Sequence, residues 1–186
     1  MKQENKQFLL KLARQTLENY YLTGNKIFLT NTELLDSELK DKRGTFVTLS
    51  IKGELRGCIG HLEPVQEIYQ DIIDNVLSAA FADNRFLPLR EDELKNLSIE
   101  ISILTKPEKL VYFSIAELLN KIIPFKQGII IKKDNNSATY LPQVWEQIPD
   151  KTEFLSSLCR KAGLLANEWK KGDLEVWIYE VEVFSE

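Results

Sequence analysis

The sequence is poor in the residues on which several protein classes depend, with two cysteines, one histidine and one methionine among 186 residues. Cys58 and Cys159 have no CxxC spacing, and one histidine cannot complete a zinc set, so we expect no metal site. No apolar run reaches the roughly 18 residues that a membrane span needs, and the first residues lead into an amphipathic stretch. We therefore expect a cytoplasmic protein with reduced thiols and no membrane association.

An excess of basic charge is also missing. The chain has 24 lysines and arginines against 28 acidic residues, a net charge of -4, and its short basic clusters are interrupted or flanked by acidic residues. This balance argues against nucleic-acid binding, because no overall positive field would attract a phosphate backbone. No cofactor motif is apparent. The length and the 44% hydrophobic content suit one domain over residues 1–186, with room for a smaller lobe.

Hydrophobic periodicity predicts helices and strands in a mixed order. Helical spacing predicts helices over residues 3–22, from Pro64 through the stripe that ends at Ala80, over 114–122 and over 151–162. Alternation predicts strands over residues 45–51, 54–59, 97–105, 128–132, 138–141 and 174–184. The first two strands form a hairpin across a short glycine-containing link, and the fourth and fifth form another. Cys159 falls on the inward side of the last helix, so we expect it in the core.

The segment Leu-Arg-Gly-Cys-Ile-Gly at residues 55–60 is the strongest candidate for a site. On an extended strand Arg56 and Cys58 project to the same side, with Cα atoms roughly 7 Å apart, so the guanidinium can favour the thiolate. Gly57 and Gly60 lack a Cβ, which lets a ligand or another backbone come close. The alternative is structural, since free cysteine often packs as a small apolar side chain.

Two further residues qualify as proton-transfer groups. His61 could serve Cys58 only if Gly60 turned the chain, because on a continuous strand the two side chains face opposite ways. Glu100 belongs to the polar side of the third strand, where it either lines a cleft as an acid or base or faces solvent.

Four polar or aromatic residues are candidates for binding. Asp83 and Arg85 lie in a turn-like connector, and they either position a substrate or form a salt bridge at a helix end. Gln143 and Trp145 either form part of a pocket wall or, in the case of the indole, pack in the core with one partner for its N–H.

Several segments together carry a family resemblance: residues 44–60, 83–88, 99–107, 138–146 and 159–164. The hexapeptide at 55–60 and the Leu-Pro-Gln-Val-Trp block at 141–145 are the most specific. In these segments the chain resembles the AMMECR-one domain family over nearly its whole length. The resemblance implies an α+β fold, a mostly antiparallel sheet flanked by helices, with a larger and a smaller lobe and a groove between them.

The resemblance also implies partners, because prokaryotic members are encoded with, or fused to, Memo-like and radical SAM proteins in the AmmeMemoRadiSam system. This chain departs from the family in the turn before Ala138, where a glycine and a basic residue are expected and Asp134 to Ser137 stand instead. Any role of that turn is therefore not carried over.

Two functions remain open at this stage. The first is an enzyme that modifies a small molecule or macromolecule with Cys58 as nucleophile, Arg56 stabilising the thiolate, His61 or Glu100 moving protons, and Asp83 with Arg85 positioning the substrate. The second is a non-catalytic module that binds a protein or ligand through the groove, with Cys58 as a packing residue and Arg56 as an anion contact or a structural salt bridge. Nucleotide binding by stacking on aromatic residues is a third and weaker option, because the acidic net charge opposes it.

Overall fold

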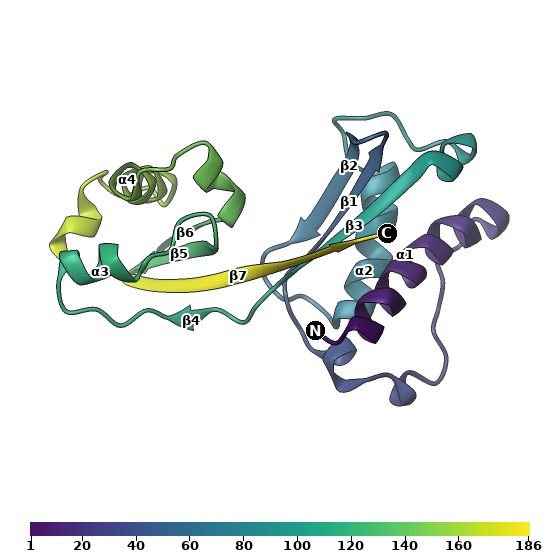
Figure 1. The fold of residues 1–186 in the computed structure, drawn as a ribbon, viewed down its shortest axis with the longest axis horizontal. Coiled ribbons are helices and arrows are strands. Elements are labelled where there is room, and N and C mark those ends of the chain that lie inside the picture. The colour runs from purple at the N-terminus through teal and green to yellow at the C-terminus, as the bar shows by residue number, and fades with distance from the viewer. The chain divides into compact units, whose positions relative to one another are not determined.

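A computed structural model describes residues 1–186, and Figure 1 shows its helices and strands in chain order. The helices are α1 (Gln3–Thr23), α2 (Ile68–Phe81), α3 (Ile115–Lys121) and α4 (Lys151–Lys161). The strands are β1 (Thr45–Ile51), β2 (Glu54–His61), β3 (Leu97–Leu104), β4 (Glu108–Lys109), β5 (Gln127–Lys133), β6 (Asn136–Tyr140) and β7 (Glu175–Ser185). The strand pairs are antiparallel, which confirms the predicted α+β class.

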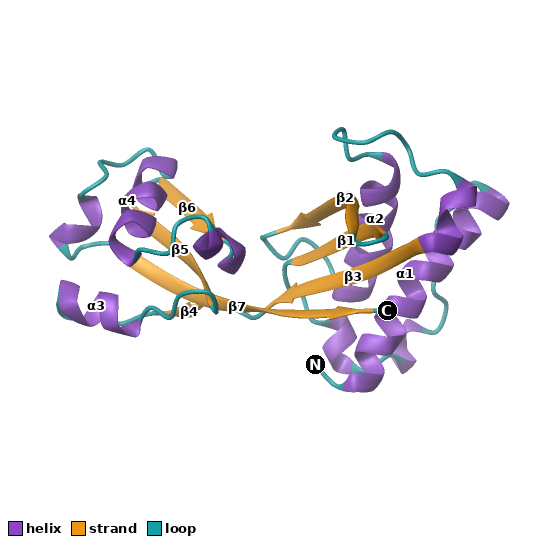
Figure 2. Ribbon diagram, turned by 45° about the horizontal axis from the view of Figure 1, so that its top comes forward, coloured by secondary structure: helices purple, strands orange, loops and turns teal.

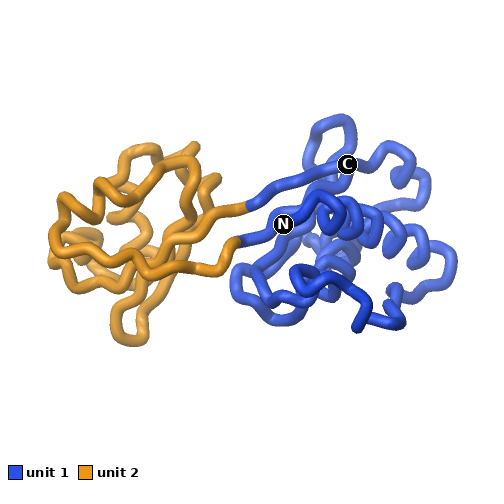
Figure 3. Tube along the Cα trace, turned by 60° about the horizontal axis from the view of Figure 1, so that its bottom comes forward, with its two compact units in different colours: residues 1–104, 182–186 blue, residues 105–181 orange.

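The chain divides into two compact units, coloured separately in Figure 3. Unit 1 comprises residues 1–104 and 182–186, and unit 2 comprises residues 105–181. The expected larger and smaller lobes are thus present. None of the helices is both long and apolar enough to cross a membrane.

Unit 1 is a sheet with two helices on one face. Its strands run in the order β2, β1, β3, and the last residues of β7 follow β3, where the Glu186 N–H donates to the Ile99 carbonyl. Helix α2 packs on β1 and β2, α1 packs on β3, and the two helices contact each other (Figure 2). Alternate residues such as Val47, Leu49 and Ile101 are fully buried beneath them. The opposite face carries the intervening side chains.

Unit 2 is built on the sheet order β6, β5, β7, with β4 paired to the other edge of β7. Helix α4 contacts β6. Trp145, Phe154 and Cys159 are fully buried in the core of this unit. The core position predicted for Cys159 is therefore confirmed.

Two predicted boundaries in unit 1 were wrong. Helix α2 begins at Ile68 and not at Pro64, because Glu67 has an extended backbone, pairs with Lys42 as a β-bridge and leaves the Ile68 N–H to donate to the Asp41 carbonyl. Strand β2 continues past Ile59 through His61, because β1 offers pairing partners along its whole length. The second difference decides how the candidate site is arranged.

Candidate functional site

Cys58 lies on β2, the edge strand of the unit 1 sheet, opposite Thr48 of β1. Its Sγ is 3.2 Å from Thr48 Oγ1, and its side chain is half-buried. Thr48 in turn lies opposite Glu100 of β3. The three side chains therefore form one row across the sheet face that the helices leave uncovered, with Glu100 two strand spacings, about 10 Å, from Cys58.

Asp83 and Arg85 hold the backbone of Cys58. The buried Asp83 carboxylate accepts the Cys58 N–H at 2.9 Å, while Arg85 Nη2 donates to the Cys58 carbonyl at 3.1 Å. Arg85 also binds Asp83 through Nε at 2.9 Å and Nη2 at 2.7 Å. These bonds occupy both backbone groups of Cys58 at the open edge of β2. The salt bridge that we considered for this pair forms, and it positions Cys58.

The charges of this cluster reinforce one another. The hydrogen bonds from the Arg85 side chain, and then the Cys58 and Arg85 backbone N–H groups, hold the pKa of Asp83 far below its ordinary value despite burial. The pKa of Arg85 is raised, chiefly by Asp83 and also by interaction with the Cys58 sulfur. Arg85 is thus the cation beside Cys58, and its ion pair with Asp83 keeps it there.

Arg56 forms the structural salt bridge that was one of its predicted roles, and it is not the partner of Cys58. The pairing of β1 and β2 contains a bulge. Leu49 of β1 lies opposite Gly57 of β2, but the next residue, Ser50, lies opposite Leu55, so Arg56 has no partner on β1 and is the extra residue of the bulge. The bulge breaks the alternation that would have brought Arg56 to the side of Cys58. Its guanidinium instead binds Glu93 through Nε at 2.9 Å and Nη2 at 3.0 Å.

The two glycines beside Cys58 serve packing and not ligand access. A Cβ on Gly57 would lie 2.1 Å from the Ala79 carbonyl oxygen, so the absent side chain lets α2 approach β2. A Cβ on Gly60 would lie 2.2 Å from the Thr45 carbonyl oxygen and 2.5 Å from the Phe46 ring. The missing side chains of Gly57 and Gly60 therefore let other parts of the chain, rather than a ligand, come close to β2.

His61 lies on the opposite face of β2 from Cys58, because the strand runs through Gly60 without turning. The structure therefore does not bring His61 and Cys58 together. His61 Nδ1 is instead 2.9 Å from Oδ1 of Asp71, a fully buried carboxylate on α2. Sequence reasoning missed Asp71, although a polar pair at helical spacing, Asp71 and Asn75, within an apolar stripe was a signal for it.

The remaining candidates belong to unit 2. Trp145 is fully buried, stacks on Phe154 with ring centroids 3.6 Å apart, and donates its indole N–H to the Gln127 carbonyl at 2.8 Å. It is a core residue, as the structural alternative held, and cannot line an open pocket. Gln143 is exposed on the short helical turn Pro142–Glu146. No group of three histidine, cysteine or acidic side chains is arranged to hold a metal ion.

Comparison with known proteins identifies relatives along the whole chain. The family model for AMMECR1 matches residues 10–184. Protein MK0488 of Methanopyrus kandleri is 39% identical over 187 residues, which covers 98% of this chain and 89% of that protein. Protein Mbar_A1807 of Methanosarcina barkeri is 43% identical over 182 residues, covering 95% and 88%. The crystal structure of uncharacterized protein PH0010 from Pyrococcus horikoshii matches with a TM-score of 0.76 and 35% identity, covering 100% of this chain and 93% of that one.

Proposed function

Because this chain belongs to the AMMECR1 family, we propose that it is an enzyme of the cytoplasm that modifies a small molecule or macromolecule through Cys58. The single observation that supports this proposal is the position of Arg85. Its guanidinium is bound to the Cys58 carbonyl, while the buried Asp83 holds it in place. A fixed positive charge beside a thiol favours the thiolate, which is the nucleophilic form of cysteine.

The proposed reaction is a transfer of a group to sulfur. Cys58 Sγ donates an electron pair to an electrophilic carbon of the substrate, and the bond from that carbon to the leaving group breaks, so that the leaving group departs with its electron pair. The thiol proton leaves to solvent when the thiolate forms, the Thr48 hydroxyl, 3.2 Å from Sγ, then donates a hydrogen bond to the thiolate, and Glu100 follows on the same sheet face. The open sheet face carries all three groups, and the step as written requires no cofactor.

The test is alkylation of the intact protein by iodoacetamide at neutral pH, followed by peptide mass spectrometry. We expect Cys58 to react readily while Cys159 stays unmodified, because Cys159 is fully buried and burial raises the pKa of its thiol. Arg85→Gln removes the charge but keeps a donor, and we expect it to slow alkylation of Cys58 about tenfold or more.

Arg90→Gln is the matched control, because Arg90 is exposed and pairs with the exposed Asp92 away from Cys58. Its alkylation rate should equal that of the unaltered protein. Reaction of both cysteines only after unfolding would contradict the proposal, as would an Arg85→Gln variant that keeps the full rate.

A second candidate, a non-catalytic binding module, is favoured by a different observation. Unit 2 exposes four large apolar side chains in the segments just before and just after α3 in the sequence: Val111, Phe113, Ile123 and Phe125. Large apolar side chains that gather into one exposed patch are typical of interaction sites. The partners we expect under either function are Memo-like and radical SAM proteins. Phe113→Ser should reduce their recovery with a tagged protein and leave Cys58 alkylation unchanged, whereas equal recovery would count against this candidate.

A further inference from the structure

Asp71 on α2 is the centre of a buried hydrogen-bond network on the helix-covered side of β2. Its Oδ2 accepts from Thr45 Oγ1 at 2.5 Å and from Asn75 Nδ2 at 3.0 Å. Its Oδ1 accepts from Gln66 Nε2 at 3.3 Å and is 2.9 Å from His61 Nδ1. The carboxylate is 1% exposed, so four neighbours replace the water that it would otherwise bind.

This network determines which nitrogen of His61 can act. The other three neighbours of Asp71 donate hydrogen bonds to it. An ionised carboxylate can only accept hydrogen bonds, so in the contact with His61 the proton lies on His61 Nδ1, which is the donor. The neutral imidazole then has its lone pair on Nε2. The His61 side chain is 44% exposed, which leaves that lone pair open to a ligand. A buried carboxylate that orients an exposed imidazole is the arrangement of a proton acceptor.

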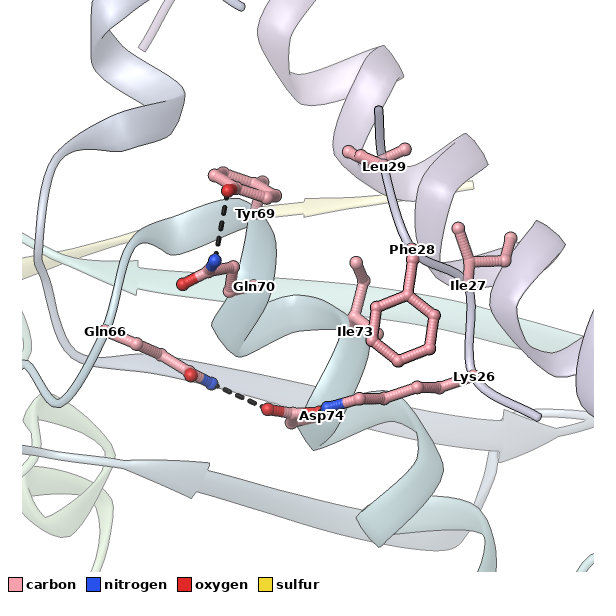
Figure 4. A pocket seen from close by; sticks show the side chains of 9 residues that line it. All are labelled: Lys26, Ile27, Phe28, Leu29, Gln66, Tyr69, Gln70, Ile73 and Asp74. Carbon is pink, nitrogen blue, oxygen red and sulfur yellow. Dashed lines mark hydrogen bonds and ion pairs between the residues drawn. The ribbon is translucent and has the colours of Figure 1, made fainter. Parts of the chain in front are cut away.

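A pocket of about 210 Å³ lies between the residues that follow α1 and the first half of α2 (Figure 4), and one of its lining residues, Gln66, is the residue that donates to Asp71. Its polar lining is Lys26, Gln66 and Asp74, and its apolar wall includes Ile27, Phe28 and Ile73. The volume is below the usual range for drug-sized ligands, so it suits a metabolite of a few heavy atoms. The Phe28 ring at the rim is 76% exposed, which leaves apolar surface for a ligand to cover.

Gln66 joins the pocket to Asp71, the carboxylate that contacts His61. Its amide Nε2 donates to Asp74 Oδ2 at 3.0 Å as well as to Asp71. Burial opposes ionisation of Asp74, yet its pKa is lowered by hydrogen bonds from Lys26 and Gln66 and by the charges of Lys26 and His61. A ligand that displaces Gln66 or contacts Asp74 will therefore change the surroundings of the imidazole.

Lys26 and Asp74 present opposite charges to the same ligand. Their ion pair measures 2.8 Å between Nζ and Oδ1, and both side chains remain about two-fifths exposed. A zwitterion whose ammonium and carboxylate are one carbon apart can place each charge against its opposite, Asp74 and Lys26. An aliphatic group on that carbon would cover Phe28 and Ile73.

We propose that this pocket is a second site that binds a small apolar amino acid, with Asp74 facing the ligand ammonium and Lys26 its carboxylate, and that Gln66 links the occupied pocket to the His61–Asp71 pair. The pocket has no residue of β2, the strand of Cys58, in its lining, and its proposed role is independent of the thiol chemistry. We expect Cys58→Ser to bind the amino acid as the unaltered protein does.

The test uses the single histidine as a reporter. The chain is prepared with ¹⁵N labelling and without a polyhistidine tag, and its imidazole signals are recorded at about pH 8, where a free imidazole is neutral, during titration with L-leucine. We expect a proton on Nδ1 in the free protein and a shift of the Nε2 signal on saturation. Calorimetry supplies the dissociation constant. Isovalerate, which lacks the ammonium, and isoamylamine, which lacks the carboxylate, should each bind about tenfold or more weakly.

Variants separate the parts of the proposal. Lys26→Gln and Asp74→Asn should each weaken leucine binding about tenfold or more, because each removes one charged contact. Lys11→Gln, on the exposed side of α1, is the control and should bind normally. Absence of leucine binding, equal binding of isovalerate, or a Lys26→Gln variant of full affinity would overturn the amino-acid site. Binding that leaves the His61 signals unmoved would overturn the link through Gln66 to the His61–Asp71 pair.

Discussion

The Asp83 carboxylate accepts the Cys58 backbone N–H at 2.9 Å, across 25 positions of sequence. Because β2 is the edge strand of its sheet, this N–H would otherwise face water or the strand of another molecule. Arg85 also donates to the Cys58 carbonyl. Residues 83–85 therefore bind the N–H and the C=O of Cys58, as one residue of a neighbouring strand would. The position of Cys58 is therefore determined by a loop as well as by the sheet.

Asp83→Asn is expected to lower the free energy of unfolding by about 1–3 kcal/mol, because the amide cannot replace the charge that binds the Arg85 side chain and its buried NH₂ group finds fewer acceptors. Urea denaturation measures the loss. The control is Asp92→Asn, whose carboxyl is 67% exposed and whose effect should stay within about 0.5 kcal/mol. Equal effects of the two variants would show that the Asp83 bonds add nothing to stability.

Stability should also depend on pH through Asp83. Its pKa in the folded protein is well below the value of about 3.9 for an unfolded chain. The unfolded state therefore binds more protons in acid, so the contribution is complete above about pH 5 and is lost as the pH falls further. Thermal unfolding between about pH 7 and pH 3 should show a flatter acid decline for Asp83→Asn. The variant should still lose some stability in acid, because the hydrogen bond from Arg56 lowers the pKa of Glu93 in the same way. Parallel curves for the two proteins would refute this prediction.

Gly57→Ala tests the close contact of β2 with α2. The added Cβ would lie 2.1 Å from the Ala79 carbonyl oxygen, and backbone cannot move aside cheaply, so we expect a loss of about 1–3 kcal/mol in unfolding free energy. Gly53→Asn is the control, because Gly53 has open space around it and asparagine tolerates its positive φ of 83°. A Gly57→Ala variant as stable as the control would mean that α2 does not pack this closely.

Arg56→Gln distinguishes the structural role of Arg56 from the effect of Arg85 on the reactivity of Cys58. The side chains of Arg56 and Glu93 are 15% and 18% exposed, and loss of their paired bonds should cost about 1–3 kcal/mol of unfolding free energy. The rate of Cys58 alkylation in the folded variant should stay unchanged, in contrast to Arg85→Gln. A reduced rate in Arg56→Gln would restore the role that the sequence suggested for Arg56.

Local pattern was sufficient for most elements and insufficient for the site. The alternation of β3 placed Ile99 and Ile101 in the core and Glu100 on the opposite face, because each residue of a strand takes the reverse side from the last. The same rule failed two strands away at Arg56, where one extra residue in β2 shifts the alternation. A bulge is defined by how two strands pair, so the sequence of either strand alone does not predict its position.

The sequence by itself determined the α+β class, the order of helices and strands, the core position of Cys159 and the family, because these depend on hydrophobic periodicity and on motifs read along the chain. Only the tertiary structure decided which polar groups meet: Arg85 and not Arg56 at the backbone of Cys58, and Asp71 behind His61. These contacts join α2 or the loop that follows it to β2, and they form wherever packing brings a donor and an acceptor within reach, whatever their separation in sequence.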